Sequence, residues 1–348
     1  AQSLCGVGEK MLGRVINGLG EPIDGKGPVA YDAEVALDAK AINPMERGEV
    51  KDVLDTGIKA INGCLTFGKG QRMGLIAGSG VGKSVLMGML TRNTAADVVV
   101  IGLIGERGRE VQEFVQKTLG EAGLARAVVI AAPVDVSPVM RIKAAKLTHS
   151  VAEYFAAKGN DVLLLFDSLT RVAHAQREIG LAGEPPTTKG YTPSVFSLLP
   201  KLIERVGVGP GPQGSISAFY TVLAEGDDRS DPIVDIARAT LDGQIMLSRE
   251  LADAAHYPAI DLEGSISRVA TNLVSADQLR LAQRLRRYWT LYAQKQDLIQ
   301  VGAYTEKTDP ELDEAIRLRG TINAFLTQGS EEAVDLSQTF NQLKQTMN

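Results

Sequence analysis

The stretch MGLIAGSGVGKSV, residues 73–85, decides the fold of this chain. Its first five residues are mostly apolar and predict a buried strand, and the glycines after them predict a tight turn that leads into a helix. Such a glycine-rich backbone at the start of a helix can point its N–H groups at a phosphate. Lys83 would reach the β- and γ-phosphates of a nucleotide, and the Ser84 hydroxyl would ligate Mg²⁺. The expected nucleotide-binding residues are Gly78, Ser79, Gly80, Val81, Gly82, Lys83, Ser84 and Val85.

This motif, a P-loop, departs from the strict pattern at its first position, where Ala77 replaces glycine. Around it, apolar strands alternate with helices. The expected strands are Met73–Ala77, Val98–Ile104, Ala127–Ala132, Val162–Phe166 and Ser215–Val222, and the expected helices are Lys83–Asn93, Ser137–Lys158, Ser168–Ile179 and Ser194–Val206. Near-continuously apolar strands are typical of a sheet covered on both faces. The alternation predicts right-handed crossovers and a parallel sheet, hence an α/β core.

After about Ser275 the strand signals stop. Three helical segments are expected there: Ala276–Gln300, Pro310–Leu326 and Glu331–Met347. We therefore expect a nucleotide-binding catalytic domain over residues 1–275 and an all-α domain over residues 276–348. The arginines on the first of these helices are interpreted as solvated helix surface.

Composition excludes several classes of protein. The net charge of −5 and the isoelectric point near 5.5 give no basic footprint, so nucleic acid is not an expected partner. Cys5 and Cys64 are too few for a disulfide framework and are expected to be reduced. No stretch approaches the roughly 18 apolar residues of a membrane span. The chain opens on Ala1, from which we expect a fragment whose natural N-terminus lies upstream.

An acidic partner for the P-loop is expected at the end of a neighbouring strand, where it would hold the water shell of the metal. Asp167 directly follows the apolar run Val162–Phe166 and is the candidate. A second explanation for Asp167 is a helix N-cap, because aspartate is favoured there.

Glu106 is the candidate for a second acidic role. It follows the strand Val98–Ile104 and would lie with Lys83 at the carboxyl edge of the sheet, where ligands bind in open parallel sheets. Hydrolysis needs a group that orients and polarises water. On the residues alone, a surface charge cluster explains the segment GERGRE, residues 105–110, equally well.

Several motifs together resemble the catalytic subunits of the rotary ATPase family, nearly from end to end. They are LGRV (12–15), GEPID (20–24), TGIK (56–59), GER (105–107), VAEYF (151–155) and YPAID (257–261). Within that superfamily, GYTPSVFSLLPKLIER (190–205) resembles the type III secretion ATPases and their flagellar export relatives, and SLL (197–199) favours the injectisome branch. The resemblance implies a RecA-like P-loop NTPase fold, with a parallel sheet core flanked by helices and a C-terminal all-α domain.

The resemblance also implies roles for residues outside the P-loop. It places the water-polarising carboxylate on Glu106, with Arg107 and Glu110 at neighbouring active-site positions. Arg171 matches an arginine near the γ-phosphate. Arg268 matches the finger that enters the site of the neighbouring subunit.

Two aromatic residues are implied on the adenine side. Tyr257 matches the residue that stacks on the base, and Tyr304 is expected as a second wall. Ordinary core packing is the alternative for both rings. The stretch Gly183–Gly190 is interpreted either as facing the channel of a ring or as a plain surface loop.

As a whole, the resemblance implies an ATP- and Mg²⁺-dependent motor of a bacterial type III secretion system, working as a homohexamer at the cytoplasmic face of the inner membrane. Its expected partners are stalk and regulator proteins of the apparatus and chaperone–effector complexes, which it would separate and unfold for export. The alternatives are a flagellar export ATPase, a proton-coupled ATP synthase β-type subunit and a catalytically silent ring subunit. Residues 191–205 argue against the synthase, and Glu106 argues against the silent subunit. The N-terminal β-barrel of the family is absent from the sequence, from which we expect a truncated chain.

Overall fold

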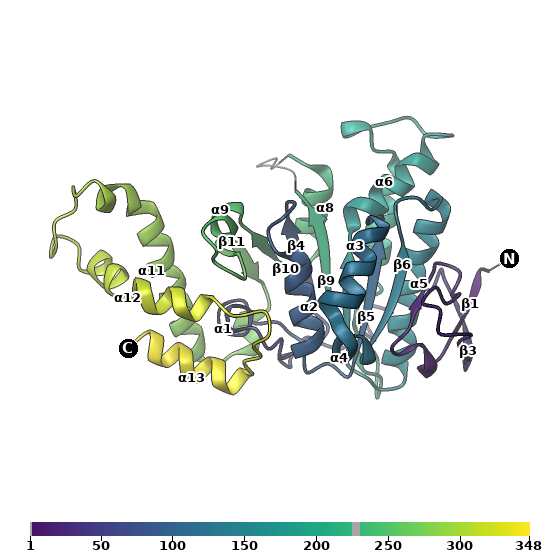
Figure 1. The fold of residues 1–348 in the computed structure, drawn as a ribbon, viewed down its shortest axis with the longest axis horizontal. Coiled ribbons are helices and arrows are strands. Elements are labelled where there is room, and N and C mark those ends of the chain that lie inside the picture. Colours follow the sequence, from purple (N-terminus) through teal and green to yellow (C-terminus); the bar gives the residue numbers. More distant parts are fainter. Residues whose placement is uncertain (1, 225–229) are drawn as a thin grey trace.

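The computed structural model describes residues 2–224 and 230–348, which are arranged in layers around a central sheet (Figure 1). The strand order in this sheet is β11-β10-β4-β9-β7-β5-β6-β2, and β8 pairs with β9 outside that path. The strands are β2 Val15–Ile16, β4 Arg72–Ala77, β5 Val98–Ile104, β6 Ala127–Ala132, β7 Val162–Asp167, β8 Gly207–Val208, β9 Ser215–Leu223, β10 Gly243–Leu247 and β11 Ile260–Ser267. β1 Leu4–Val7 and β3 Ala33–Ala36 form a separate two-stranded sheet.

The direction of the strands brings the ends of four of them together. Neighbours from β10 to β2 pair in parallel, whereas β11 and β8 are antiparallel to their partners. The register aligns Leu103 with Asp167 and Ala77 with Leu223. The residues that follow β4, β5 and β7 therefore lie along one edge of the sheet.

Helices cover both faces of the sheet. The helices are α1 Lys59–Cys64, α2 Lys83–Asn93, α3 Gly108–Glu113, α4 Gly120–Ala125, α5 Pro138–Ala157, α6 Leu169–Gly180, α7 Pro193–Ile203, α8 Pro232–Thr240, α9 Arg249–Asp253, α10 Ala270–Leu273, α11 Ala276–Gln300, α12 Pro310–Leu326 and α13 Leu336–Thr346. A π-helical stretch, η2 Phe114–Leu119, joins α3 to α4, and short 3₁₀ turns form at η1 Glu9–Met11 and η3 Thr188–Gly190. No helix in residues 2–224 and 230–348 is both long and apolar enough to cross a membrane.

The period-2 geometry of a strand explains the continuous apolar runs. Val98 and Val100 of β5 belong to the core shared with α5 to α8, whereas Val99 and Ile101 belong to the core shared with α1 and α2. A strand of this kind is buried on both sides, so its sequence shows no alternation of apolar and polar residues.

The last three helices share the second of these cores. Trp289 and Leu285 of α11 and Phe325 of α12 are buried in the same cluster as Leu75 of β4. The short helix α1 connects the two parts: Phe325 lies so close to Gly63 that a Cβ there would stand 2.7 Å from its ring. Figure 1 shows α11 and α12 extending away from the sheet beyond this contact.

The predicted α/β fold with an appended helical segment is confirmed, and most boundaries agree within two residues. α13 begins at Leu336 rather than Glu331, because Asp335 is its N-cap and forms a capping box with Gln338. In the central sheet, β8, β10 and β11 were not predicted, and because β8 and β11 are antiparallel to their partners the sheet is mixed rather than purely parallel. Residues 183–187 form an exposed connection from α6 toward η3.

Candidate active site

The P-loop connects β4 to α2 as the sequence predicts. Gly80 and Gly82 have φ angles of 71° and 87°, a left-handed conformation that residues with a Cβ rarely adopt. Gly82 is the N-cap of α2 and, as a glycine, has no side chain to cap the first amides of this helix. Those N–H groups, at the positive end of an eleven-residue helix, are placed to receive an anion.

Lys83 lies between two carboxylates that come from neighbouring strands. Its Nζ is 2.9 Å from Oδ1 and 2.8 Å from Oδ2 of Asp167, and 3.9 Å from Oε1 of Glu106. All three side chains are at most 16% exposed. The structure therefore brings together the loop lysine and both predicted acids.

Asp167 is held in this position by a second donor. Thr221 of β9 donates from Oγ1 to Asp167 Oδ1 at 2.7 Å. The N-cap of α6 is Ser168, which accepts a hydrogen bond from the Arg171 amide at 3.2 Å, so the N-cap explanation does not apply to Asp167 itself. Its carboxylate is left to face Lys83.

Glu106 has an unusual electrostatic environment. Burial, and then the nearby charge of Asp167, raise the pKa of Glu106 to about 8, although the Lys83 ammonium acts in the opposite direction. The neighbouring Glu110 is affected in the opposite direction: the hydrogen bond between the carboxyl groups of Glu106 and Glu110 lowers the pKa of Glu110. Burial and the neighbouring acids therefore favour the protonated form of Glu106 in the empty site, and the ionised form of Glu110.

Two buried polar atoms beside the P-loop have no hydrogen-bond partner among the described residues. They are Oε1 of Glu106 and Nε of Arg171. The stem of Arg171 packs on Gly105, where an added Cβ would lie 2.6 Å from the Arg171 Cβ. Buried polar groups are rarely left without partners, and these two stand where a phosphate and its water are expected. The site thus fits a nucleotide.

Magnesium fits the same site only together with a nucleotide. Among the described residues, no group of three or more His, Cys, Asp or Glu side chains could hold a metal ion by itself. Mg²⁺ is commonly bound by one or two protein oxygens together with phosphates and water. Ser84, exposed at the start of α2, and Asp167 are the predicted protein ligands.

Tyr257 lies beside the P-loop. Its ring is 43% exposed, and an added Cβ on Gly82 would stand 3.2 Å from its Cε1. Core packing therefore does not account for this side chain. An exposed ring next to the phosphate-binding turn is placed to stack on a base.

The expectation for Tyr304 needs correction. It lies in the connection between α11 and α12, where its hydroxyl donates to Asp313 Oδ1 at 2.5 Å and its ring packs in a small cluster with Leu291 and Leu312. The 25 residues of α11 span about 37 Å at 1.5 Å per residue and carry this connection away from the sheet (Figure 1). Within the chain, Tyr304 is not a wall of the P-loop site.

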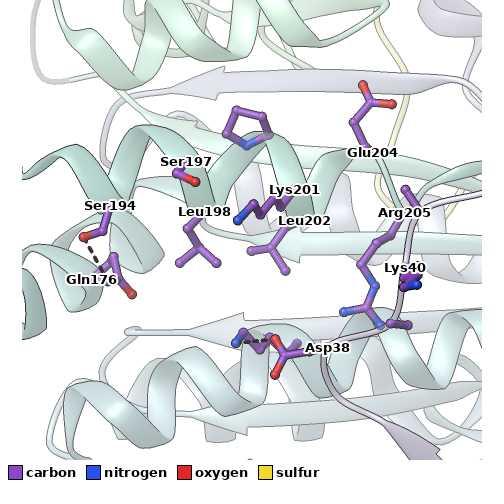
Figure 2. Close-up of a pocket in the computed structure, with 14 residues that line it drawn as sticks. Asp38, Lys40, Gln176, Ser194, Ser197, Leu198, Lys201, Leu202, Glu204 and Arg205 are labelled. Carbon is purple, nitrogen blue, oxygen red and sulfur yellow. Dashed lines mark hydrogen bonds and ion pairs between the residues drawn. The ribbon is translucent and has the colours of Figure 1, made fainter. Parts of the chain in front are cut away.

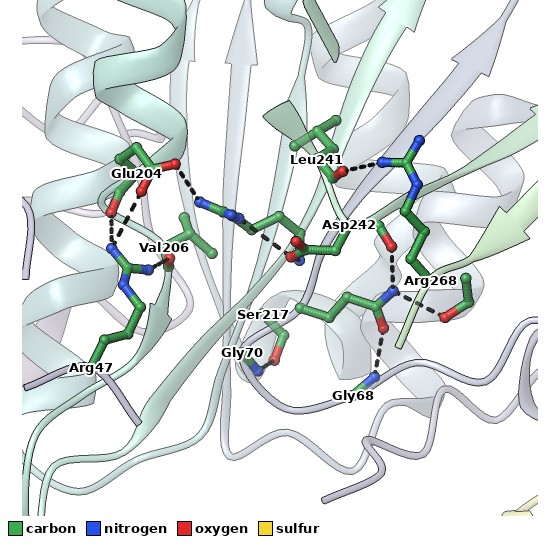
Figure 3. Close-up of polar contacts among 12 residues, drawn as sticks. Arg47, Gly68, Gly70, Glu204, Val206, Ser217, Leu241, Asp242 and Arg268 are labelled. Carbon is green, nitrogen blue, oxygen red and sulfur yellow. Dashed lines mark hydrogen bonds and ion pairs between the residues drawn. The ribbon is translucent and has the colours of Figure 1, made fainter. Parts of the chain in front are cut away.

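Arg268 lies at the opposite edge of the sheet from Lys83. Since β11 is antiparallel to β10, its last residue, Ser267, pairs with Gly243 at the start of β10. The Arg268 guanidinium donates from Nη1 to the carbonyl oxygen of Leu241 at 2.7 Å (Figure 3). The same nitrogen donates to the carbonyl oxygen of Arg238 at 3.1 Å. The length of β4, roughly 20 Å at 3.3 Å per residue, separates this point from the P-loop of the same chain.

One contact to the P-loop was missed at the sequence level. Arg249, at the start of α9, donates to the carbonyl oxygen of Ser79. It follows β10, and the sequence GQIML, residues 243–247, was not recognised as a strand. Recognition of that strand would have placed Arg249 at the carboxyl edge of the sheet with the other site residues.

A groove of about 690 Å³ lies elsewhere, between α7 and residues 38–41 (Figure 2). Its walls include Lys40, Lys201 and Leu198, and the Lys146–Asp38 ion pair (2.6 Å) closes one side. α7 belongs to the core on the face opposite α2, so the groove has no part in the P-loop chemistry. It is lined in part by the segment 190–205 that resembles the secretion ATPases.

Comparison with known proteins gives the family. The model of the ATP synthase alpha/beta family, nucleotide-binding domain, matches residues 57–267. The flagellum-specific ATP synthase of Pseudomonas aeruginosa is 56% identical over 334 residues, which cover 96% of this chain and 74% of that protein. The chain belongs to the ATP synthase alpha/beta family. The model of the T3SS EscN ATPase C-terminal domain matches residues 274–345, so this member of the family carries a secretion-type C-terminal segment.

Relatives from both kinds of export system are similar to this alpha/beta family member. The type 3 secretion system ATPase of Xanthomonas euvesicatoria is 52% identical over 327 residues, which cover 94% of this chain and 74% of that protein. A solved structure shows the assembled ATPase EscN in complex with its central stalk EscO, from the enteropathogenic E. coli type III secretion system. It matches with a TM-score of 0.93 at 43% identity and covers 99% of this chain and 83% of that one.

Proposed function

We propose that this chain is the ATP-hydrolysing motor of a bacterial type III protein export system. The observation that carries the proposal is the group of Lys83, Asp167 and Glu106 at the carboxyl edge of the sheet, in a chain with a secretion-type C-terminal segment. ATP is hydrolysed to ADP and phosphate, and the energy serves protein transport. The nucleotide-binding part is assigned to residues 1–275 and the C-terminal helical part to residues 276–348.

The P-loop residues 78–85 bind the phosphates, and Lys83 exchanges its contact with Asp167 for the β- and γ-phosphate oxygens. The Ser84 hydroxyl and the released Asp167 carboxylate hold Mg²⁺ and its water. Bound Mg²⁺ supplies positive charge that neutralises the phosphate oxygens and weakens the bond to the leaving group.

Glu106 polarises the attacking water. Burial, and then the charge of Asp167, raise the pKa of Glu106 to about 8 and favour its protonated form in the empty site. Neutralisation of the Asp167 charge in the loaded site would remove the second of these causes and would lower the pKa of Glu106. The carboxylate form that can accept a proton from water is then favoured. Arg171, with its unpartnered Nε, is placed to contact the γ-phosphate.

Arg268 acts in trans. It cannot reach the P-loop of its own chain, because about 20 Å of strand lies between them. Within the described residues its contacts use Nη1, so Nε and Nη2 are available to a phosphate held by a second copy. A ring of identical subunits, in which each lends its arginine to the next, satisfies this geometry. The family relative EscN is seen as an assembled ATPase.

Two export systems remain candidates. The flagellar branch is favoured by identity, 56% to the Pseudomonas aeruginosa protein against 52% to the Xanthomonas euvesicatoria protein. The injectisome branch is favoured by SLL, residues 197–199, and by the fit to EscN. In both, the chain would work at the cytoplasmic face of the inner membrane with a stalk protein, regulators and chaperone–substrate complexes.

Phosphate release measured with the parent and with Lys83→Ala tests the enzyme. The variant should show no turnover, because the charge on the transferring phosphate is lost. Full activity of Lys83→Ala would refute the P-loop assignment. Deletion of the gene then separates the branches: loss of motility with effector secretion intact assigns the flagellum, and the reverse assigns the injectisome.

A mixing experiment tests the trans role. Arg268→Ala should bind nucleotide but not hydrolyse it, and should regain activity when mixed with excess Lys83→Ala subunits. The mixture forms interfaces that pair an intact P-loop with an intact arginine. Absence of any rescue in rings that contain both variants would place Arg268 outside the reaction.

A further inference from the structure

Gln71 directly precedes β4, and its side chain is completely buried (0% exposed). The amide makes three hydrogen bonds at the end of the sheet remote from the P-loop, near Gly68, Asp242 and Arg268, which Figure 3 labels. Nε2 donates to the carbonyl oxygen of Asp242 at 3.2 Å and to Ser267 Oγ at 3.0 Å, and Oε1 accepts from the Gly68 amide at 2.9 Å. One side chain therefore joins the turn before β4, the start of β10 and the end of β11.

Arg268 rests on the same backbone. Its amide donates to the carbonyl oxygen of Asp242 at 3.0 Å, and its guanidinium donates to that of Leu241 at 2.7 Å. The Asp242 carboxylate in turn accepts from the Arg72 amide at 3.0 Å. We call residues 241–242 the platform: Gln71 and Arg72 donate hydrogen bonds to it, and Arg268 also donates to its carbonyl oxygens.

We propose that Gln71 is a positioning residue for Arg268. The proposal rests on the function above, in which Arg268 acts on the nucleotide of a neighbouring subunit. A buried amide whose polar atoms are all hydrogen-bonded has one available orientation. It therefore fixes the position of residues 241–242 and, through them, the backbone position from which the Arg268 side chain extends. Gln71 directly precedes β4, the strand that leads into the P-loop. The same strand therefore connects the P-loop of a subunit to the residues that position Arg268, which acts on the neighbouring subunit.

The effect of losing this side chain is expected on turnover and not on nucleotide binding. A displacement of about 1 Å in a positioned catalytic group can cost roughly 100-fold in rate. Gln71→Met keeps the length of the side chain and removes its donors. We expect kcat to fall by about 10- to 100-fold, whereas KM for MgATP and the affinity for a fluorescent ATP analogue stay within about twofold of the parent.

Mixed rings provide a readout that a general structural defect would not produce. Gln71→Met subunits retain an intact P-loop, so an excess of Lys83→Ala subunits, which have a correctly held Arg268, should restore activity. The restored rate per Gln71→Met subunit should equal that of parent subunits diluted in the same way. Lack of restoration, with nucleotide binding intact, would show that Gln71 acts on its own P-loop and would overturn the proposal.

Ser217→Ala is the matched control. Ser217, in β9, is equally buried and accepts a hydrogen bond at 2.8 Å from the amide of Gly70, in the turn before β4. Among the described residues, no hydrogen bond joins its side chain to residues 241–242. Its kcat should equal that of the parent. If Gln71→Met does not fold, Ser267→Ala removes one acceptor of the Gln71 amide at a partly exposed position and should show a smaller loss with the same rescue. An unchanged kcat in Ser267→Ala would then refute the inference.

The same mixing experiment with Arg268→Ala distinguishes a failure of the positioning role of Gln71 from a failure of the proposed trans role of Arg268. If Lys83→Ala subunits do not rescue Arg268→Ala, the trans role itself fails. If they rescue Arg268→Ala and not Gln71→Met, the trans role holds and only the positioning role is wrong.

Discussion

Replacement of Glu106 by glutamine should stabilise the protein in the absence of nucleotide while it removes activity. The parent keeps Glu106 protonated at pH 7, with a pKa of about 8, although the unfolded chain would ionise it near its ordinary value of 4.5. This protonation costs the folded state about 3 kcal/mol at pH 7, from 1.36 kcal/mol for each of about 2.5 pH units. The lowered pKa of Glu110 returns part of that cost, so the net gain expected for Glu106→Gln is positive and smaller than about 3 kcal/mol.

The raised pKa of Glu106 determines how the stability difference between the parent and Glu106→Gln changes with pH. A carboxyl whose pKa is raised on folding destabilises the folded state progressively as pH rises from about 4.5 to about 8, and glutamine has no such dependence. The advantage of Glu106→Gln should therefore be absent near pH 4.5 and grow up to pH 8. Urea unfolding across this range, in chelator and without nucleotide, measures it. Glu110→Gln is the matched control, because the pKa of Glu110 is lowered and its loss should destabilise.

The same variant should bind MgATP about as well as the parent and lose at least 10²-fold in turnover, because the amide keeps the shape of the carboxyl but not its charge. A Glu106→Gln protein that is less stable than the parent at pH 8 would show that Glu106 is ionised in the empty site. The reasoning about its proton would then be refuted.

Further changes test other parts of the structure. Tyr257→Ala should raise KM for ATP about threefold to tenfold through lost stacking, and Tyr257→Phe should be nearly silent; a Phe variant as impaired as Ala would assign the role to the hydroxyl. Thr221→Val, which removes the donor to Asp167, should raise the Mg²⁺ concentration for half-maximal turnover by about tenfold, and an unchanged requirement would contradict the assignment of Asp167 to the metal. Asp24→Asn should lower the free energy of unfolding at pH 7 by about 2 kcal/mol, because the paired Arg14 guanidinium (2.8 and 2.9 Å) holds the Asp24 pKa well below its usual range. That difference should shrink as pH falls below about 4, and a difference that stays constant down to pH 3 would mean that the pair does not shift the Asp24 pKa.

Sequence reasoning succeeded where one local pattern determines one structure. The apolar runs of β5 and β7 end directly before Glu106 and Asp167, and parallel pairing then places both acids beside Lys83. For such strands, the residue that follows the apolar run is the functional residue, so its position in the fold can be predicted from the sequence.

It failed where position depends on a partner strand. The five residues of β10 alternate between buried and partly exposed, and β11 closes the sheet in the antiparallel direction, so neither resembles the buried parallel strands. That reversal of direction puts Arg268 at the far edge, which spacing along the chain does not reveal. Tyr304 was misplaced for a similar reason, because the reach of α11 depends on how the helix leaves the sheet.

The core shared by the sheet and the last three helices constrains how the enzyme is organised. Lys59 of α1 donates from Nζ to the Ala324 carbonyl oxygen, and Gln328, just beyond α12, bonds the Gly57 carbonyl and the Lys59 amide through its side chain. The Gln328 amide also bonds the carbonyl oxygen of Tyr257, the ring beside the P-loop. A protein cut at residue 275 would expose the apolar side of α1 and part of β4 to water and would aggregate rather than fold as a minimal enzyme. Because the backbone amide of Gln328 bonds the Tyr257 carbonyl oxygen, a tilt of α12 caused by a bound partner would also displace Tyr257, the residue expected to stack on the base.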